Sequence, residues 1–134
     1  MNTKIKLLSS GFALTLAVCL FAACGGAAVS LAGAKLALED EGCTVTSILK
    51  SDLPETFENH QDVIKSAYRV EKGTANDVYL VEFNTKDDAI DAYTSISSNK
   101  QRASHLIMYT SNDIAAGDAK IVWEAFTAYV NTCG

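Results

Sequence analysis

The sequence predicts an α+β domain in which an antiparallel sheet carries helices on one face. Short β-branched and aromatic runs alternate with segments whose apolar residues recur at helical spacing. From residue 44 to residue 110 the predicted order is strand, helix, strand, strand, helix, strand. This is the order of the ferredoxin-like split βαβ sandwich, and one further helix is expected to flank it at each end.

The first predicted elements are a flanking helix and a strand. Residues 27–41 are rich in Ala and Leu, and a helix is expected from about Ser30 to Gly42, whose missing Cβ suits a helix C-terminal turn. The same stretch is also compatible with a tether of fluctuating helicity. The β-branched run Thr44–Leu49 then predicts the first strand.

A helix and a second strand are expected next. Pro54 fits the first turn of a helix, and the apolar residues that share its face are Phe57, Ile64 and Tyr68. Residues 67–72 predict the second strand, and residues 73–77 contain the Gly and Asn that favour a turn.

The second half of the domain repeats this alternation. Val78–Phe83 is apolar on both faces, which predicts a strand in the middle of the sheet. Thr85, followed by acidic residues, marks the start of a helix that runs to about Ser98. Another strand is expected at Ser104–Thr110. The apolar positions of Asp113–Val130 fit either a helix or a strand, and the length of this stretch favours a helix.

The composition excludes several kinds of partner. The chain has 134 residues, enough for one domain behind a targeting segment. Its 11 Lys and Arg and 16 Asp and Glu give a net charge of −5, which becomes −7 without Lys4 and Lys6. An acidic chain without a basic cluster argues against nucleic acid as a partner and against electrostatic binding to an anionic membrane.

The chain begins with the pattern of an exported protein. Lys4 and Lys6 precede seventeen uncharged residues, Leu7 to Ala23, which end in small side chains. A positive head, an apolar run and small residues at its end form a secretory signal peptide. The alternative is an uncleaved membrane helix that continues to about Ala34, although the Gly25-Gly26 pair interrupts it.

The end of this run resembles the signal of bacterial lipoproteins. In that family two small residues precede a cysteine, and here Ala22-Ala23 precede Cys24 and Gly25-Gly26 follow it. The family usually has Leu three residues before the cysteine, where this chain has Phe21. The resemblance implies that Cys24 is acylated and becomes the first mature residue. The lipid would then hold the protein on a cell membrane, facing outside the cytoplasm.

These predictions divide the chain into three parts. Residues 1–23 are the signal peptide, residues 24–42 a lipid-anchored tether or helix, and residues 43–134 one α+β domain. Of the four cysteines, only Cys43 and Cys133 lie in that domain. Because export places them where disulfides persist, a Cys43–Cys133 bridge is expected, the alternative being two free thiols.

The sequence contains no familiar catalytic motif. It has no Gly-x-Ser-x-Gly elbow, phosphate loop, Cys-x-x-Cys or His-Glu-x-x-His pattern. His60 and His105 are far apart, the acidic clusters lack the spacing of a calcium loop, and no cofactor or metal is expected. A candidate binding surface consists of Trp123, Phe126 and Tyr129, although a small domain also needs aromatic residues in its core.

The leading hypothesis is a membrane-anchored, non-enzymatic lipoprotein that binds an unknown protein or small ligand. The export signal and the missing catalytic motifs support it. One alternative is a small inhibitor or immunity-type lipoprotein, because compact rigid domains suit recognition through one face. Another is a hydrolase whose site is built from dispersed Asp, Glu and His105 side chains.

Overall fold

The computed structural model describes residues 28–133. The predicted signal peptide and the predicted acylation site at Cys24 lie outside these residues. The strands are β2 (Thr44–Ile48), β3 (Ile64–Lys72), β4 (Ala75–Phe83), β5 (Asn99–Ala103) and β6 (Leu106–Thr110). The α-helices are α2 (Leu31–Asp40), α3 (Lys86–Ser95) and α4 (Gly117–Thr132), and the 3₁₀ helices are η1 (Lys50–Asp52) and η2 (Glu55–Val63).

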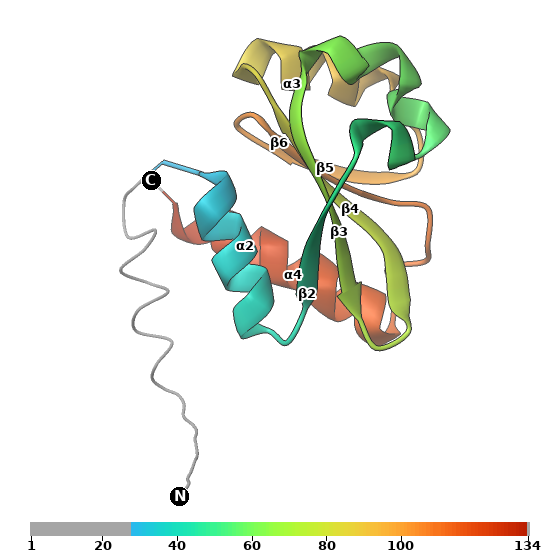
Figure 1. Cartoon of the computed structure of the whole chain (residues 1–134). Coiled ribbons are helices and arrows are strands. Elements are labelled where there is room, and N and C mark those ends of the chain that lie inside the picture. The colour runs from blue at the N-terminus through green and yellow to red at the C-terminus, as the bar shows by residue number, and fades with distance from the viewer. Residues whose placement is uncertain (1–27, 134) are drawn as a thin grey trace, which may run out of the picture.

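The strands form one antiparallel sheet with helices on both faces (Figure 1). Their order is β2-β3-β4-β6-β5, so β4 lies in the middle, as its two apolar faces predict. The two internal helices η2 and α3 share one face, and the flanking helices α2 and α4 cover the other. The predicted α+β sandwich, with an antiparallel sheet and a helix on either side of it in the sequence, is confirmed.

Helices α2 and α4 enclose the first core. Alternate side chains of the inner strands point toward them, so one layer of apolar residues fills the space between sheet and helices. Ser30 caps α2 by accepting a hydrogen bond from the Gly33 N–H at 3.0 Å, and Gly42 follows the helix with a φ of +89°. The main members of this core are Val70, Val78, Leu80, Leu106, Met108, Val122 and Phe126.

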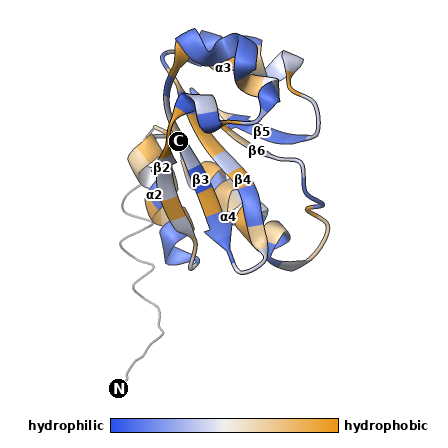
Figure 2. Ribbon diagram, turned by 45° about the vertical axis from the view of Figure 1, so that its right-hand side comes forward, coloured by the Kyte–Doolittle hydropathy of each residue, from blue (hydrophilic) through white to orange (hydrophobic). Residues whose placement is uncertain are grey.

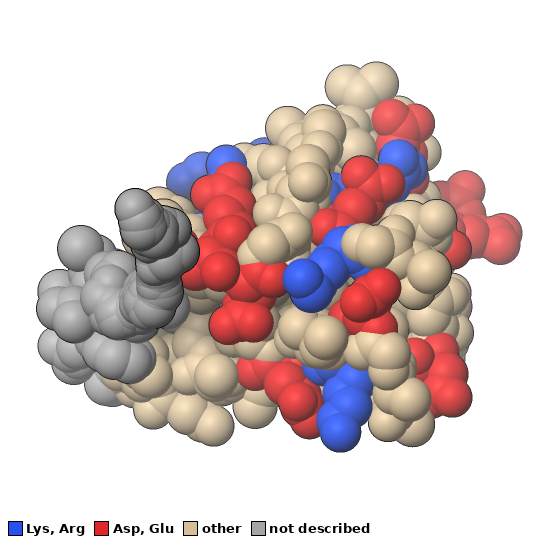
Figure 3. Space-filling model, turned by 90° about the horizontal axis from the view of Figure 1, so that it is seen from below, with Lys and Arg blue, Asp and Glu red and all other residues tan. Residues whose placement is uncertain are grey.

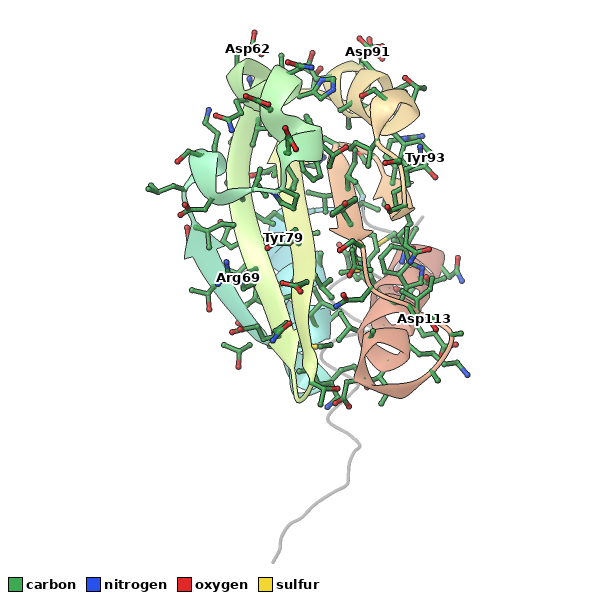
Figure 4. All side chains as sticks on the ribbon, turned by 90° about the vertical axis from the view of Figure 1, so that its right-hand side faces the viewer. Asp62, Arg69, Tyr79, Asp91, Tyr93 and Asp113 are labelled. Carbon is green, nitrogen blue, oxygen red and sulfur yellow. The ribbon has the colours of Figure 1, made fainter. Side chains whose placement is uncertain are left out.

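Helices η2 and α3 enclose the second core at one end of the opposite face (Figure 4). Phe57 of η2 stacks edge-on against Tyr109, with ring centroids 5.4 Å apart. Thr85 caps α3 by accepting a hydrogen bond from the Asp88 N–H at 3.1 Å, as predicted. In Figure 2 the outward side of α3 is hydrophilic, while the strands carry hydrophobic segments between the layers.

The predicted helix after Pro54 is wrong in length and type. It is the 3₁₀ helix η2, and it ends at Val63, so Ile64 and Tyr68 belong to β3 instead. From Ile64 onward the chain pairs with β4, and from Ala67 with β2 as well. Pairing on two sides stabilises an extended chain more than the helical spacing of three apolar residues stabilises a helix.

Strand β5 was not predicted. Its residues Asn99–Ala103 are mostly polar because it is an edge strand, and they pair with β6 through a tight hairpin. The hairpin places Ser104 in the left-handed region with a φ of 55°. The predicted strand at Ser104–Thr110 therefore begins two residues later, at Leu106.

The predicted Cys43–Cys133 disulfide is also wrong, because Cys43 carries a free thiol. Cys43 precedes β2 beside Lys72 and the β3–β4 turn, and Asp118 at the start of α4 binds that turn through Thr74. Cys133 follows the other end of α4. A helix of 16 residues spans about 24 Å, whereas a disulfide requires Cα atoms within about 7 Å.

Among residues 28–133, none of the helices has both the length and the apolar character that crossing a membrane requires.

Candidate binding surface

The aromatic residues predicted as a candidate surface do not form one. Phe126 is fully buried and Tyr129 is 4% exposed, while Trp123 lies half-buried at the rim of the same core. The Tyr129 hydroxyl accepts a hydrogen bond from the Ser30 N–H at 3.0 Å and donates one to the Ser30 carbonyl at 3.2 Å. These aromatic residues therefore hold α4 against α2, which is the core role that a small domain requires.

A second group brings together a carboxylate, an imidazole and two hydroxyls. Glu82 of β4 is 8% exposed; one of its oxygens accepts a hydrogen bond from Ser66 at 2.8 Å, and the other lies 3.2 Å from His105 Nε2. His105 Nδ1 lies 3.4 Å from the hydroxyl of Ser104, its neighbour in the chain. These contacts join β3, β4 and the β5–β6 hairpin.

This polar group satisfies a buried charge. A buried carboxylate without partners destabilises a fold, and here both oxygens of Glu82 are hydrogen-bonded. His60, the other histidine, belongs to a different contact on η2, where its Nε2 is 2.8 Å from the Ser95 hydroxyl at the end of α3. The structure therefore places the two histidines apart, and each joins neighbouring elements.

One row of side chains crosses all five strands on the face that η2 and α3 cover only in part. Register partners lie directly opposite one another on the same face of a sheet. The row that this register gives is Thr46, Arg69, Tyr79, Tyr109 and Lys100. Figure 4 shows Arg69 and Tyr79 near the middle of the sheet, beyond the end covered by the two helices. We call these five residues the cross-strand row.

Arg69 is the residue of this row that has a buried polar atom without a hydrogen bond within residues 28–133. Its guanidinium carbon lies 5.9 Å from the centre of the Tyr79 ring, and its Nε is buried without a hydrogen bond. The ion pairs within residues 28–133 are Glu82–His105 and Lys120–Glu124, so Arg69 belongs to neither. A buried donor without an acceptor costs about 1–3 kcal/mol, and more for a charged group.

Lys100, at the other end of the cross-strand row, has a structural role. Its Nζ donates hydrogen bonds to the carbonyls of Tyr93 and Ile96 at 2.6 and 2.7 Å, and it lies 4.4 Å from the centre of the Tyr93 ring. A cation on the last carbonyls of a helix stabilises that end, so Lys100 holds α3 on the sheet. Arg69 also lies near a tyrosine ring, but within residues 28–133 it donates no hydrogen bond.

The strand beside Arg69 has a free edge. Strand β2 is the outermost strand on its side of the sheet, and Thr44–Ile48 contains no charged residue and no proline. Natural edge strands usually carry such residues, which prevent other chains from pairing with them. Strand β5 at the opposite edge carries Lys100 and Arg102. Within residues 28–133, the β2 edge is therefore the one open to another extended chain.

Acidic side chains gather at the end of the molecule that carries the β3–β4 turn, where Asp and Glu outnumber Lys and Arg (Figure 3). A shallow hollow of about 420 Å³ there is lined by Asp77, Asp113 and Asp118. Asp118 accepts hydrogen bonds from Thr74, and Asp113 accepts one from the Ala115 N–H at 2.9 Å. Within residues 28–133, no three His, Cys, Asp or Glu side chains are placed to hold a metal ion.

Arg69 was missed at the level of sequence because nothing there distinguishes it from a solvated strand residue. The alternation of Ala67, Arg69 and Glu71 places it on one face of a strand. Whether its guanidinium finds a hydrogen-bond acceptor depends on the side chains of the two neighbouring strands, which the local sequence does not identify.

Comparison with family models, with curated proteins and with solved structures found no match to this chain.

Proposed function

We propose that this protein is a lipid-anchored binding module on the outer side of a bacterial cell membrane, without catalytic activity. The observation that carries the proposal is the N-terminal pattern, in which Lys4 and Lys6, an uncharged run and Ala22-Ala23 lead to Cys24. Acyl chains on Cys24 would supply the membrane affinity that the acidic composition does not provide.

The start of the domain supports a short tether. Both backbone groups of Ser30 are hydrogen-bonded to Tyr129, and Val29 before it packs against the first core, so the domain holds the chain from Val29 onward. Five residues separate Cys24 from Ser30, and the six Cα-to-Cα steps between them span at most about 20 Å in an extended chain. An anchored domain would stay close to the lipid surface, with the junction of α2 and α4 toward it. Arg69, which is half-buried, lies on the other face of the sheet from these helices.

A binding role also agrees with the chemistry around Arg69. Arg is among the residues most enriched at the energetic centres of protein interfaces, and the neighbouring Tyr79 and Tyr109, 9% and 7% exposed, belong to the second core beneath it. An inhibitor or immunity-type lipoprotein is one form of this function, because it too recognises a protein through one rigid face. The partner distinguishes the two forms, and the fold does not.

A hydrolase is the second candidate, and the contact of Glu82, His105 and Ser104 is the observation that favours it. A serine hydrolase needs a hydroxyl that its histidine can deprotonate. The 3.4 Å contact joins sequence neighbours in a tight hairpin, and Glu82 is also held by Ser66. Hydrolysis of an activated ester that disappears in Ser104→Ala, in a variant that keeps its fold, would favour this candidate.

The intact mass of the protein extracted from its own membrane tests the proposal. The expected mass is that of residues 24–134 plus acyl chains, and Cys24→Ala should accumulate as unprocessed precursor. Cys19→Ala, which changes the other cysteine of the apolar run, serves as the matched control and should mature normally. A full-length mass without acyl chains, or normal maturation of Cys24→Ala, would remove the lipid anchor from the proposal.

A further inference from the structure

We propose that Arg69, together with Tyr79, binds a carboxylate carried by an extended peptide segment of the partner, and that this segment lies along the free edge of β2. The inference rests on the proposed binding function and names the chemistry of the partner. It joins two independent observations, an unpartnered guanidinium and an uncharged edge strand next to it.

The guanidinium is held in place but not satisfied. The guanidinium carbon of Arg69 lies 5.9 Å from the centre of the Tyr79 ring, and its Nε is buried, so its terminal Nη groups are the donors that a ligand can reach. Within residues 28–133 no carboxylate or carbonyl accepts a hydrogen bond from it. Within the same residues, the hydroxyls of Tyr79 and Tyr109, whose side chains are 9% and 7% exposed, also have no hydrogen-bond partner and could donate to an anion. An acceptor brought by a ligand would complete these hydrogen bonds.

The charge of the surroundings favours a carboxylate over a phosphate. The planar guanidinium fork matches either group. However, Glu71 lies two residues along β3 on the same face, and Asp77 lies two residues before Tyr79 on β4. These carboxylates would repel a phosphate, which carries close to two negative charges, more strongly than a carboxylate, which carries one.

The free edge identifies the carrier of the carboxylate as an extended chain. Thr46 of β2 lies directly opposite Arg69, so a strand added to β2 would run one strand spacing from Thr46, on the side away from Arg69. An acidic side chain on that strand has the length to approach the guanidinium across Thr46. A second copy of this protein, paired through its own β2, would not supply the carboxylate, because Thr44–Ile48 contains no acidic residue.

The first test places the carboxylate in the protein itself. In the full-length chain, Thr46→Glu puts a carboxylate opposite Arg69, and Thr46→Gln is its neutral control. We expect the thermal midpoint of Thr46→Glu to exceed that of Thr46→Gln by about 1–4 °C, and the difference to disappear with Arg69→Met. Ser47→Glu adds the same charge on the opposite face and should show no dependence on Arg69. A difference that persists in Arg69→Met would overturn the assignment of Arg69.

The second test uses two peptides, acetyl-Thr-Val-Glu-Val-Thr-amide and the same peptide with Gln in place of Glu. Binding is followed by nuclear magnetic resonance through the Arg69 Nε–H signal and the backbone amides of β2. The Glu peptide should bind roughly tenfold more tightly than the Gln peptide, and Arg69→Met should remove the difference. Equal affinities, or the absence of shifts at Arg69 and β2, would overturn the proposal.

These tests separate the two proposals. Both use purified protein, and neither depends on acylation of Cys24. Failure of the peptide test with a correct intact mass would leave the anchored module and remove its carboxylate site. The reverse result would leave the site and remove the anchor.

Discussion

Cys43 carries a thiol that apolar side chains almost enclose at the start of β2. Burial raises the pKa of this thiol; the positive charge of Lys72 acts against the rise, and the negative charge of Glu41 adds to it. The thiolate is the reactive form of cysteine, so a raised pKa makes Cys43 a poor nucleophile. Cys43 therefore acts as a small apolar residue of the first core.

The first prediction concerns this thiol. Cys43→Ala should lower the free energy of unfolding by about 1 kcal/mol, the effect of a small core truncation, and not by the 4–5 kcal/mol of a long-range disulfide. Without reductant, iodoacetamide should leave Cys43 unmodified in the native protein and alkylate it in urea, as read by peptide mass. A Cys43 that resists alkylation in urea until reductant is added would contradict the free thiol.

At the scale of single residues, the sequence showed which candidate side chains are present more readily than which side chains they contact. The histidines were visible in it, but the contact of His105 with Glu82 depends on β4 and a hairpin 23 residues later. Arg69 is the clearest example, because an unpaired guanidinium differs from a paired one only in what surrounds it. Phe126 is buried, which agrees with the alternative interpretation from the sequence that the aromatic residues of a small domain fill its core.

Among the elements, α2 and α4 make the closest helix contact. Gly33 lies against Tyr129, and a Cβ added at Gly33 would collide with the Tyr129 hydroxyl and ring. The same hydroxyl is hydrogen-bonded to both backbone groups of Ser30. The small residue in α2 and the large one in α4 are therefore complementary, and the pair fixes how the first helix lies on the last.

The second prediction uses this contact. Ala is a better helix residue than Gly by about 1 kcal/mol, so Gly33→Ala would stabilise α2 if the helix stood alone. In the protein we expect it to destabilise by about 1–3 kcal/mol, because Tyr129 must move. In a Tyr129→Phe background the loss should be smaller, since the colliding oxygen is gone. Urea unfolding of the four proteins measures this coupling, and a stabilising Gly33→Ala would contradict the contact.

The predictability of the elements follows from where their stabilisation originates. Helices α2 and α3 carry their own start signals, Ser30 and Thr85, and both were predicted at the right place. Strand β5 is polar because it lies at an edge, so its apolar pattern is too weak to detect. The start of β3 is set by pairing with β4 and β2, which no local pattern encodes.

At the scale of the whole molecule, α4 is attached at both of its ends. Tyr129 ties its last turn to Ser30, next to the predicted tether. At its start, one carboxylate oxygen of Asp118 accepts hydrogen bonds from the Thr74 N–H at 3.0 Å and the Thr74 hydroxyl at 3.2 Å. A Cβ at Gly73, which has a φ of +56°, would collide with that carboxylate. At the acidic end of the molecule, the Asp118 carboxylate is thus the group that joins the start of α4 to the β3–β4 turn.

This closure predicts a dependence of stability on pH. The hydrogen bond from the Thr74 backbone lowers the pKa of Asp118 below its ordinary value, with smaller contributions in the same direction from the Thr74 hydroxyl and Lys72. A carboxyl whose pKa is lower in the folded state binds fewer protons there than in the unfolded chain. The ionised Asp118 carboxylate therefore stabilises the fold fully above the ordinary pKa of 3.8, and this contribution is lost as the pH falls through the lowered pKa.

Asp118→Asn, which keeps the shape of the side chain and removes its charge, should therefore lower the free energy of unfolding at pH 7, and the difference from the wild type should shrink below pH 3.8. The neighbouring Asp113→Asn is the control, because Asp113 accepts its hydrogen bond within its own loop and does not join α4 to the sheet. Urea unfolding of the three proteins between pH 2 and pH 7 gives the comparison.

Because Asp118 is exposed to solvent, added salt should weaken the effect. A difference between Asp118→Asn and the wild type that does not change with pH would mean that the shape of the side chain, and not its charge, closes this end of the molecule.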